Sequence, residues 1–254
     1  MNVVFVGGDE RMAISALLLE KEGHRVKTVG LKTALPTLST DEIFSFAEAV
    51  VLPIPCTKDG KTVLGTDIPL SLFANPSLIL WGGALPPFLR SLPLAHDFLE
   101  DEPFTLSNAL LTAQGGIAYA LGATKRGFWG IDAAVLGFGR IGGFLTEMMR
   151  GFAVPISVYA RREEVLTRAS LLGFQAKKWQ EPLSVPERVV FNTIPQEING
   201  LSFSPSSLVI DLGGGLAHYA SHPVTSLRGL PGIFSPKAAG EIVYKTLSAF
   251  FRKE

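Results

Sequence analysis

The chain has few of the residues on which several classes of protein depend. It contains one cysteine among 254 residues, which excludes an internal disulfide framework and a metal site built from several thiolates. Because this residue, Cys56, lies in an apolar run, we expect a buried structural thiol and not a nucleophile. There are four histidines and no HExxH pattern, so a zinc site is not expected. The GxSxG turn of many serine hydrolases is also missing.

Excess charge and long hydrophobic runs are missing as well. Lys and Arg number 23, as do Asp and Glu, which gives no electrostatic basis for binding nucleic acid or an anionic membrane. The apolar run at 78–81 is followed by glycines and prolines and is too short for a membrane span. The first residues lack a basic segment before the run at 3–6, so no secretory signal is expected. We therefore expect a cytoplasmic protein without a metal, membrane or nucleic-acid partner.

Short apolar runs alternate with helical patterns along the chain. This alternation is typical of parallel α/β sheets. We predict strands at 3–6, 24–29, 49–54, 77–81, 133–136, 156–160, 189–192 and 208–212, and helices at 10–22, 41–47 and from Ser235-Pro236 onward. The predicted fold is α/β, with two doubly wound Rossmann-like domains with parallel sheets, joined by a connecting helix. We place an N-terminal substrate or partner domain at 1–105, the connecting helix at 106–127, a dinucleotide-binding Rossmann domain at 128–234, and a C-terminal helix packing back towards the N-terminal domain at 235–254.

A glycine-rich turn follows the predicted strand at 133–136. It reads Gly137-Phe138-Gly139-Arg140-Ile141-Gly142 and opens a helical pattern. In a dinucleotide-binding unit the first glycine allows the tight turn, the second admits a pyrophosphate to the backbone, and the third lets helix pack on strand. The pyrophosphate would lie at the helix N-terminus. The alternative is a glycine-rich turn without a ligand.

Two arginines follow the next predicted strand, where an NAD-binding site usually has an acidic residue. Arg161 lies 24 positions after Gly137 and is followed by Arg162. Paired guanidinium groups suit a 2′-phosphate. We therefore expect NADP as the cofactor, with NAD less favoured; the alternative is a solvated pair at a strand end.

Other candidate residues also follow predicted strands, because ligands of open α/β sheets gather at the carboxyl ends of strands. Thr193-Ile194-Pro195 is expected to lie beside the nicotinamide ribose, and Asp211 to belong to the cofactor site. The glycines at 213–215 would leave the backbone open to a ligand. Ordinary turns are the alternative for each segment.

Three further positions suit an anionic substrate or close packing. Lys237 opens the last predicted helix, where its charge and the helix dipole act together. Arg11 follows a strand exit and could hold a carboxylate, with Asp9 capping the helix or orienting Arg11. The alternative is a surface arginine beside a capping aspartate. The glycine pair at 115–116 inside the connecting helix indicates close packing or a nearby ligand.

Together these segments resemble the family of the A subunit of dipicolinate synthase, its oxidoreductase component. The matching residues are 7–9 with Arg11, Asn108 with Thr112 and Gly115, 135–140, 192–195, 230–233 and 235–240. The resemblance implies an NADP site in the C-terminal half, a substrate from the lysine pathway, and the flavoprotein-like B subunit of dipicolinate synthase as partner. It also implies a place in the mother-cell cytoplasm during sporulation, and a homo-oligomer is possible. Gln114 stands where a glutamate is expected from the family.

The function expected from this resemblance is the NADP-dependent oxidation of dihydrodipicolinate, or of its hydroxy-tetrahydro precursor, to dipicolinate. We assign catalytic roles to Lys237 and Thr112, and the expected substrate-binding residues are Arg11, Asp9, Asn108 and Gln114. One alternative is a non-catalytic NADP-binding scaffold for a flavoprotein. Another is a dehydrogenase for a different cyclic imino or 2-hydroxy acid. The 2-hydroxy acid is disfavoured, because Lys237 occupies the position of the proton-accepting histidine of that superfamily and lysine is a poor base near neutral pH.

Overall fold

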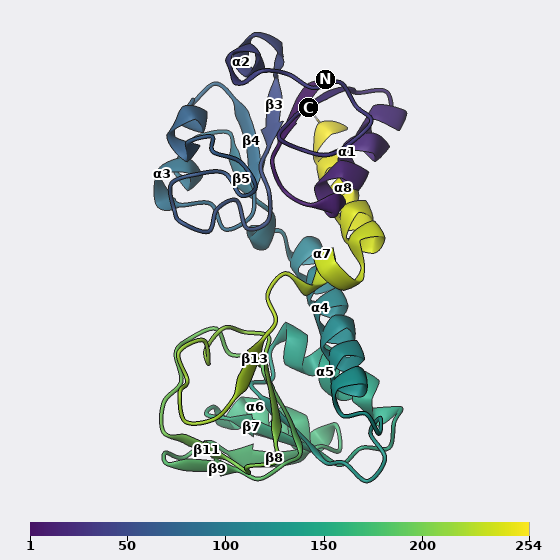
Figure 1. Ribbon diagram of the computed structural model, residues 1–254, viewed down its shortest axis with the longest axis vertical. Coiled ribbons are helices and arrows are strands. Elements are labelled where there is room, and N and C mark those ends of the chain that lie inside the picture. The colour runs from purple at the N-terminus through teal and green to yellow at the C-terminus, as the bar shows by residue number, and fades with distance from the viewer. Residues whose placement is uncertain (254) are drawn as a thin grey trace. The chain divides into compact units, whose positions relative to one another are not determined.

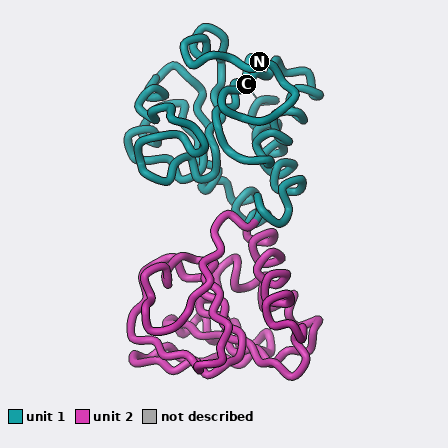
Figure 2. The backbone as a smooth tube through the Cα atoms, in the orientation of Figure 1, with its two compact units in different colours: residues 1–108, 231–254 teal, residues 109–230 magenta. Residues whose placement is uncertain are grey.

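The computed structural model describes residues 1–253 and consists of two compact units. Unit 1 comprises residues 1–108 and 231–254, and unit 2 comprises residues 109–230 (Figure 2). Each unit is built on a parallel sheet with helices, so the predicted α/β class is confirmed. The chain enters unit 2 within helix α4 (Glu102–Ala123) and leaves it within α7 (Leu230–Phe234).

Unit 1 has a five-stranded sheet in the order β2-β1-β3-β4-β5. All neighbouring strands pair in parallel. The strands are β1 (Asn2–Val6), β2 (Arg25–Val29), β3 (Ala49–Val51), β4 (Ile79–Gly82) and β5 (Ala95–Asp97). This order reverses direction between β1 and β3, as in doubly wound folds. The carboxyl end of β1 therefore lies at a point where such folds bind ligands.

Helices cover both faces of the sheet in unit 1. They are α1 (Glu10–Lys21), α2 (Ile43–Phe46), α3 (Pro87–Arg90) and α8 (Pro236–Phe251), with 3-10 turns at Thr40–Glu42, Leu70–Phe73 and Phe98–Glu100. Alternate residues of β1 point to opposite faces: Val3 and Phe5 join one hydrophobic cluster, and Val4 and Val6 the other.

The C-terminal helix α8 packs against α1 (Figure 1). Its residues Val243, Leu247 and Phe251 share a buried cluster with the first strand. A Cβ atom added at Gly240 would come within 2.7 Å of Ile14 Cβ, so only glycine allows this approach. The last helix therefore completes the core that the first strand begins.

Unit 2 has a six-stranded parallel sheet in the order β13-β12-β10-β6-β7-β8. The strands are β6 (Ala133–Leu136), β7 (Ile156–Ala160), β8 (Gln175–Lys178), β10 (Val189–Asn192), β12 (Leu208–Asp211) and β13 (Val224–Ser226). Numbered from β6, this is the 3-2-1-4-5-6 order of a Rossmann dinucleotide-binding domain. The direction of winding changes between β6 and β10. A separate two-stranded sheet pairs β9 (Leu183–Val185) with β11 (Leu201–Phe203).

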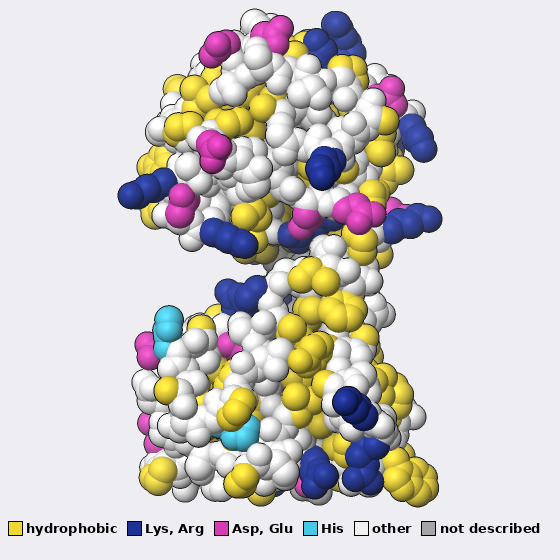
Figure 3. Space-filling model, in the orientation of Figure 1, with side chains coloured by type: hydrophobic (Ala, Val, Ile, Leu, Met, Phe, Trp, Pro, Cys, Tyr) yellow, Lys and Arg dark blue, Asp and Glu magenta, His cyan; other side chains and the backbone are white. Residues whose placement is uncertain are grey.

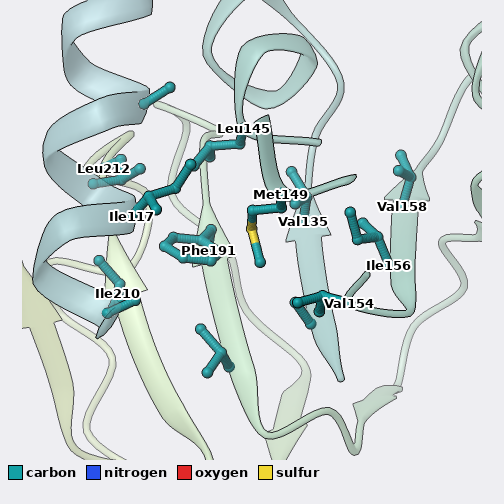
Figure 4. Packing of buried hydrophobic residues seen from close by; sticks show 14 of the residues in the cluster. Ile117, Val135, Leu145, Met149, Val154, Ile156, Val158, Phe191, Ile210 and Leu212 are labelled. Carbon is teal, nitrogen blue, oxygen red and sulfur yellow. The ribbon is translucent and has the colours of Figure 1, made fainter. Parts of the chain in front are cut away.

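Helices α4, α5 (Arg140–Arg150) and α6 (Glu163–Leu171) contribute to one large core of unit 2. Figure 4 shows Leu145 and Met149 of α5 lying over Val135 and Phe191 of the sheet, with Ile117 of α4 alongside. The glycine pair of α4 serves close packing: added Cβ atoms at Gly115 and Gly116 would lie 3.2 and 3.0 Å from leucine side chains at 230 and 212.

Several predicted boundaries differ from the observed ones. Helix α4 begins at Glu102 and not at 106, because Asp101 Oδ1 accepts a hydrogen bond from the Phe104 amide at 2.7 Å and caps the helix. It ends at Ala123, ahead of Lys125, whose φ is 52°. The strand predicted at 49–54 ends at Val51. Strands β5, β8, β9, β11 and β13 and helices α3, α6 and α7 were not predicted.

The surface of unit 1 carries interspersed charges of both signs on the face seen in Figure 3. Within residues 1–253, no helix is long and apolar enough to cross a membrane.

Candidate functional site

A pocket of about 450 Å³ lies where four strands of unit 2 end. The segments that follow β6, β7, β8 and β10 all contribute to its wall. The lining residues are Gly137, Phe138, Gly139, Ala160, Arg161, Arg162, Val165, Trp179, Thr193, Ile194, Pro195, Gln196, Glu197 and Ile198. The pocket therefore occupies the switch point at which Rossmann domains bind dinucleotides.

The three glycines of the turn after β6 have different surroundings. Gly137 has φ +87°, which disfavours any other residue, and an added Cβ would lie 2.8 Å from Ile194. At Gly139 no described atom lies within 4 Å of an added Cβ, so the backbone is open to the pocket. At Gly142 an added Cβ would overlap the carbonyl oxygen of Gly137. The first glycine thus allows the tight turn, the second leaves the backbone open, and the third lets the helix pack closely.

Helix α5 begins at Arg140, with Gly139 as its N-cap. Arg140 is exposed, whereas Ile141 packs against the core and does not line the pocket. Of the motif, Gly137, Phe138 and Gly139 line the pocket. An anion bound in the pocket at Gly139 would lie beside the N-terminus of an 11-residue helix.

A hydrogen bond from Thr193 links the segment after β10 to the end of β6, where the glycine turn begins. The Thr193 hydroxyl donates to the carbonyl oxygen of Leu136 at 2.9 Å. Thr193, Ile194 and Pro195 all line the pocket. The register that pairs Asn192 with Leu136 brings these two strand ends together.

Asp211, expected in the cofactor site, is directed into the protein. It is fully buried, and its Oδ1 accepts hydrogen bonds from Asn192 Nδ2 at 2.8 Å and from the Gly214 amide at 2.7 Å. Its Oδ2 accepts from the Leu216 amide at 3.1 Å. The carboxylate therefore holds the loop after β12 and lies outside the pocket wall.

The glycines at 213–215 do not leave backbone open to a ligand, in contrast to the expectation. Added Cβ atoms at Gly213 and Gly215 would overlap backbone atoms of Ile194 and Gln196, and one at Gly214 would overlap the guanidinium of Arg228. These glycines let the loop after β12 pack closely beneath the loop after β10. Gly213 and Gly215 pack against Ile194 and Gln196, which line the pocket.

The two arginines after β7 both line the pocket. Arg161 Nη2 lies 3.0 Å from Glu181 Oε1, and its guanidinium is 5.4 Å from the centre of the Trp179 ring. Arg162 Nη1 lies 3.2 Å from Glu164 Oε1. Both arginine side chains are largely exposed, at 65% and 74%. Their positive charge therefore stays accessible to a ligand while each has a nearby carboxylate.

Asp9 and Arg11 form a close pair at the start of α1 in unit 1. Asp9 is the N-cap and accepts a hydrogen bond from the Arg11 amide at 3.2 Å. Arg11 Nε lies 2.9 Å from Asp9 Oδ1, and Arg11 Nη2 donates to the carbonyl oxygen of Ile54. The arginine side chain is only 6% exposed, whereas that of Asp9 is 42% exposed. Asp9 thus both caps the helix and orients Arg11.

Gly232 of α7 lies against this pair, because an added Cβ would come within 2.7 Å of Asp9 Oδ2 and 3.3 Å of Arg11 Nε. Lys237, in the first turn of α8, belongs to the same unit and is exposed. Ser235 precedes α8 as its N-cap residue but makes no side-chain capping bond.

The remaining candidates lie on α4. Asn108 is the last residue of unit 1 before the chain enters unit 2, which contains Thr112 and Gln114. Thr112 is buried, Asn108 is partly buried, and Gln114 is exposed. The sequence-predicted substrate residues are therefore divided between the two units.

Several pocket residues were missed by sequence analysis: Ala160, Val165, Trp179, Gln196, Glu197 and Ile198. Trp179 directly follows the edge strand β8, and Gln196 continues the segment after β10. The strand-exit rule would have found Trp179 had β8 been recognised.

Cys56 is buried, as predicted. Burial, with the nearby Asp97 carboxylate, raises the pKa of its thiol to about 11. Such a thiol is protonated at neutral pH and is a poor nucleophile. Among residues 1–253, no three His, Cys, Asp or Glu side chains are grouped so as to hold a metal ion.

Residues 2–80 match the family model that describes the N-terminal domain of the dipicolinate synthase A subunit. The chain is also 25% identical to the A subunit of dipicolinate synthase from Bacillus subtilis (strain 168), over 98% of its own length and 95% of that protein. The resemblance to this family, inferred from the motifs, is confirmed.

Solved structures agree in fold. The crystal structure of the dipicolinate synthase A subunit from Bacillus halodurans has a TM-score of 0.82 at 22% identity, covering 98% of this chain and 96% of that one. An NADPH-dependent glyoxylate/hydroxypyruvate reductase from Sinorhizobium meliloti has a TM-score of 0.53 at 14% identity, covering 99% and 94%. The likeness in fold to these structures therefore extends over both units.

Proposed function

We propose that the chain is an NADP-dependent oxidoreductase that oxidises dihydrodipicolinate, or its hydroxy-tetrahydro precursor, to dipicolinate as the A subunit of a dipicolinate synthase. The observation that carries the proposal is the pocket of unit 2, in which an open glycine backbone and two arginines line the same cavity. The likeness to the dipicolinate synthase A subunit of Bacillus subtilis over nearly the whole chain supports dipicolinate as the product.

The residues present fit a dinucleotide. A Cβ at Gly139 would occupy the open space where a pyrophosphate would approach the backbone. Gly137, Gly139 and the start of α5 would hold the pyrophosphate, with Arg140 close by on the first turn. Arg161 and Arg162 would hold the 2′-phosphate, and the wall formed by residues 193–195 would position the nicotinamide ribose. The ordinary charge preference of such an arginine pair favours NADP over NAD.

A bound nicotinamide cofactor supplies a hydride acceptor, and oxidation of the dihydropyridine ring to an aromatic ring releases one hydride and one proton. If the substrate is the hydroxy-tetrahydro form, one water is also lost. In unit 1, Arg11 and Lys237 are proposed to bind substrate carboxylates. Asp9 keeps the Arg11 side chain oriented, as its contact of 2.9 Å with Nε indicates.

Three residues of α4 are also proposed to act on the substrate. Asn108 and Gln114 would bind the substrate, and Thr112 would donate a hydrogen bond. A glutamine carries no proton-accepting carboxylate, so Gln114 would act in binding and not as a base. By the same resemblance, the proposed setting is the cytoplasm, and the proposed partner is the B subunit of the synthase.

A second candidate function is a non-catalytic NADP-binding scaffold for that partner. Gln114 favours it, because this position lacks the ionisable side chain that would accept a proton. Both candidates require the cofactor pocket of unit 2. They differ in whether this chain alone oxidises the substrate.

The deciding experiment uses the purified chain, NADP⁺ and the fresh condensation product of pyruvate and aspartate semialdehyde, with and without the partner protein. NADPH and dipicolinate are followed together. Equal production of both by this chain alone supports the catalytic proposal. Production that requires the partner supports a shared site or the scaffold. NADPH binding without any product in either mixture contradicts the proposed substrate.

The arginines are tested in the same preparation. We expect Arg161→Ala and Arg162→Ala each to weaken NADPH binding several-fold, by about 1 kcal/mol, and to leave NADH binding nearly unchanged. Arg188→Ala is the matched control, because Arg188 is an exposed arginine of the same unit outside the pocket wall. An equal loss of NADPH and NADH affinity would contradict recognition of the 2′-phosphate.

A further inference from the structure

Arg161 of the pocket wall forms an ion pair that the arginine pattern alone does not reveal, and its partner, Glu181, lies just outside the wall. Glu181 lies on the segment between β8 and β9, twenty residues after Arg161 in the chain. Its Oε1 accepts hydrogen bonds from Arg161 Nη2 at 3.0 Å and from Trp179 Nε1 at 3.3 Å. Arg161 and Trp179 both line the pocket. One carboxylate oxygen thus connects the two residues on this side of the cavity.

The Glu181 carboxylate also lies near Gly200, where an added Cβ would come into ordinary van der Waals contact, 3.7 Å from Glu181 Cγ and 3.8 Å from Oε2. The indole of Trp179 is 5% exposed and so gives Glu181 a fixed donor. Glu181 itself is half exposed, with 50% of its side chain accessible. Arg161 is therefore partnered by a positioned carboxylate at the edge of the pocket.

This arrangement has opposite effects on the two nicotinamide dinucleotides. A 2′-phosphate bound by Arg161 would lie near the Glu181 carboxylate, and the two negative charges repel. A free ribose 2′-hydroxyl, by contrast, can donate a hydrogen bond to a carboxylate, as it does to the acidic residue of NAD-binding sites. Arg162 is paired with a different carboxylate, that of Glu164, on its own helix.

We propose that Glu181 is a specificity-determining residue that sets how strongly the pocket selects NADP over NAD, by competing with the 2′-phosphate for Arg161. The inference rests on the proposed dinucleotide site and goes beyond it, because it places an acidic determinant on a segment remote from the arginine pair. Binding of NADPH requires Arg161 to exchange Glu181 for the phosphate. Binding of NADH leaves the Arg161–Glu181 pair intact.

The test is Glu181→Gln, which keeps the size of the side chain and removes its charge. Dissociation constants for NADPH and NADH are measured by calorimetric titration of the full chain. We expect NADPH affinity to rise about three- to fivefold, the range of an exposed ion pair, and NADH affinity to stay equal or fall. The readout is the ratio of the two affinities in each protein.

Glu147→Gln is the matched control. Glu147 is half exposed, forms an ion pair with Arg150 at 3.1 Å in the same unit, and lies outside the pocket wall. The control changes net charge by the same amount, so a general electrostatic effect would raise NADPH affinity in both variants.

Three outcomes are distinguishable. A ratio that rises in Glu181→Gln and not in Glu147→Gln supports the inference. A ratio that stays constant or falls in Glu181→Gln, or rises equally in both variants, overturns it while the dinucleotide site stands. If neither dinucleotide binds the unaltered chain or either variant, the proposed function fails and the inference fails with it.

Discussion

Asn192 and Asp211, the last residues of the adjacent strands β10 and β12, are joined by a fully buried hydrogen bond of 2.8 Å. Asn192 also bonds both the amide and the carbonyl of Ile194, while Asp211 accepts from the loop amides at 214 and 216. This pair therefore fixes two loops at once, and one of them is a wall of the pocket. It acts on the cofactor site without lining it.

Replacing the buried acceptor should loosen that wall. Asp211→Asn replaces one of the two acceptor oxygens with an NH2 donor, so at least one of the three N–H groups loses its acceptor, and we expect a loss of about 2 kcal/mol in the free energy of unfolding. Urea denaturation measures this loss, and hydrogen exchange of the amides at 213–216 should become faster. Asp132→Asn is the control, since the carboxylate of exposed Asp132 accepts one backbone hydrogen bond, from the Arg188 amide. Weaker NADPH binding at unchanged stability and exchange would instead make Asp211 a direct ligand.

Substitution by alanine should have different effects at Gly139 and Gly142 of the turn after β6 and at Gly143 of α5. Gly142→Ala should lower the free energy of unfolding by about 1–3 kcal/mol, because the methyl group would overlap the Gly137 carbonyl. Gly139→Ala should leave stability nearly unchanged, since Gly139 has φ −82° and open space beside it. It should nevertheless weaken NADPH binding about tenfold, because the methyl would separate backbone and pyrophosphate.

Gly143→Ala is the control within this series. The described part of the chain has no atom within 4 Å of an added Cβ at Gly143, which lies within α5. Alanine there should stabilise the protein by up to about 1 kcal/mol and leave NADPH affinity unchanged. Equal effects of alanine at 139 and 143 on NADPH affinity would contradict the assignment of Gly139 to the pyrophosphate.

A buried polar cluster in unit 2 predicts a pH dependence of stability. Lys177 Nζ lies 2.7 Å from Glu187 Oε1, and Tyr159 donates to the same carboxylate at 3.1 Å. Burial is the largest single influence and would raise the pKa of Glu187, but its hydrogen bonds and the positive charge of Lys177 together outweigh burial and lower that pKa below its usual value of 4.5. The carboxylate therefore contributes stability above about pH 4.5, and this stability is lost as the pH falls through the lowered pKa of the folded state.

Glu187→Gln should thus destabilise the protein by about 1–2 kcal/mol at neutral pH. This value lies between those of exposed and buried ion pairs, because Glu187 is buried whereas Lys177 is 38% exposed. The difference from the unaltered protein should shrink as the pH falls below about 4.5, as measured by urea denaturation across pH. Tyr159→Phe removes one hydrogen bond and retains the Lys177–Glu187 pair, so it should keep the pH dependence. A difference that stays constant with pH would show that Glu187 is uncharged in the folded protein.

The thiol of Cys56 should react slowly with alkylating reagents. Its pKa is raised to about 11 by burial and by the Asp97 carboxylate, so the thiolate fraction at neutral pH is very small. The rate of alkylation in the folded protein should increase with pH up to about 11, and unfolding in urea should abolish the protection. Rapid alkylation of the folded chain at neutral pH would contradict a buried structural role. Leu85→Ala tests how burial affects the alkylation rate of the Cys56 thiol, because Leu85 packs in the same hydrophobic cluster as Cys56.

The strongly apolar central strands and the glycine turn could be predicted because each carries a local pattern. β6, β7 and β10 are mostly apolar and are buried at every position, and the run at 137–142 follows β6 directly. Edge strand β8 could not be predicted from the sequence, because its residues Gln-Ala-Lys-Lys do not alternate between apolar and polar. Its pairing with β7 depends on tertiary context, so Trp179 and Glu181 were missed along with it.

The glycines after β12 show why a motif does not by itself identify a binding site. Gly213 and the open Gly139 look alike in the sequence, and only the backbone of Ile194 packed against Gly213 distinguishes them. Asp211 is a second example. Its position at a strand end suggests a ligand-binding carboxylate, but in the structure the carboxylate accepts hydrogen bonds from three donors within the protein. Strand exits indicate where a ligand can bind, and loop packing decides which residues reach it.

The packing of α8 onto α1 has a consequence for the order in which the protein is made. Val243, Leu247 and Phe251 belong to the cluster that contains Val3 and Phe5, so the nascent chain cannot complete this core until residues 243–251 have left the ribosome. Unit 2, a continuous segment from 109 to 230, has all its residues available earlier. The unit whose synthesis begins first therefore has all the residues of its core only after the whole of unit 2 has been synthesised.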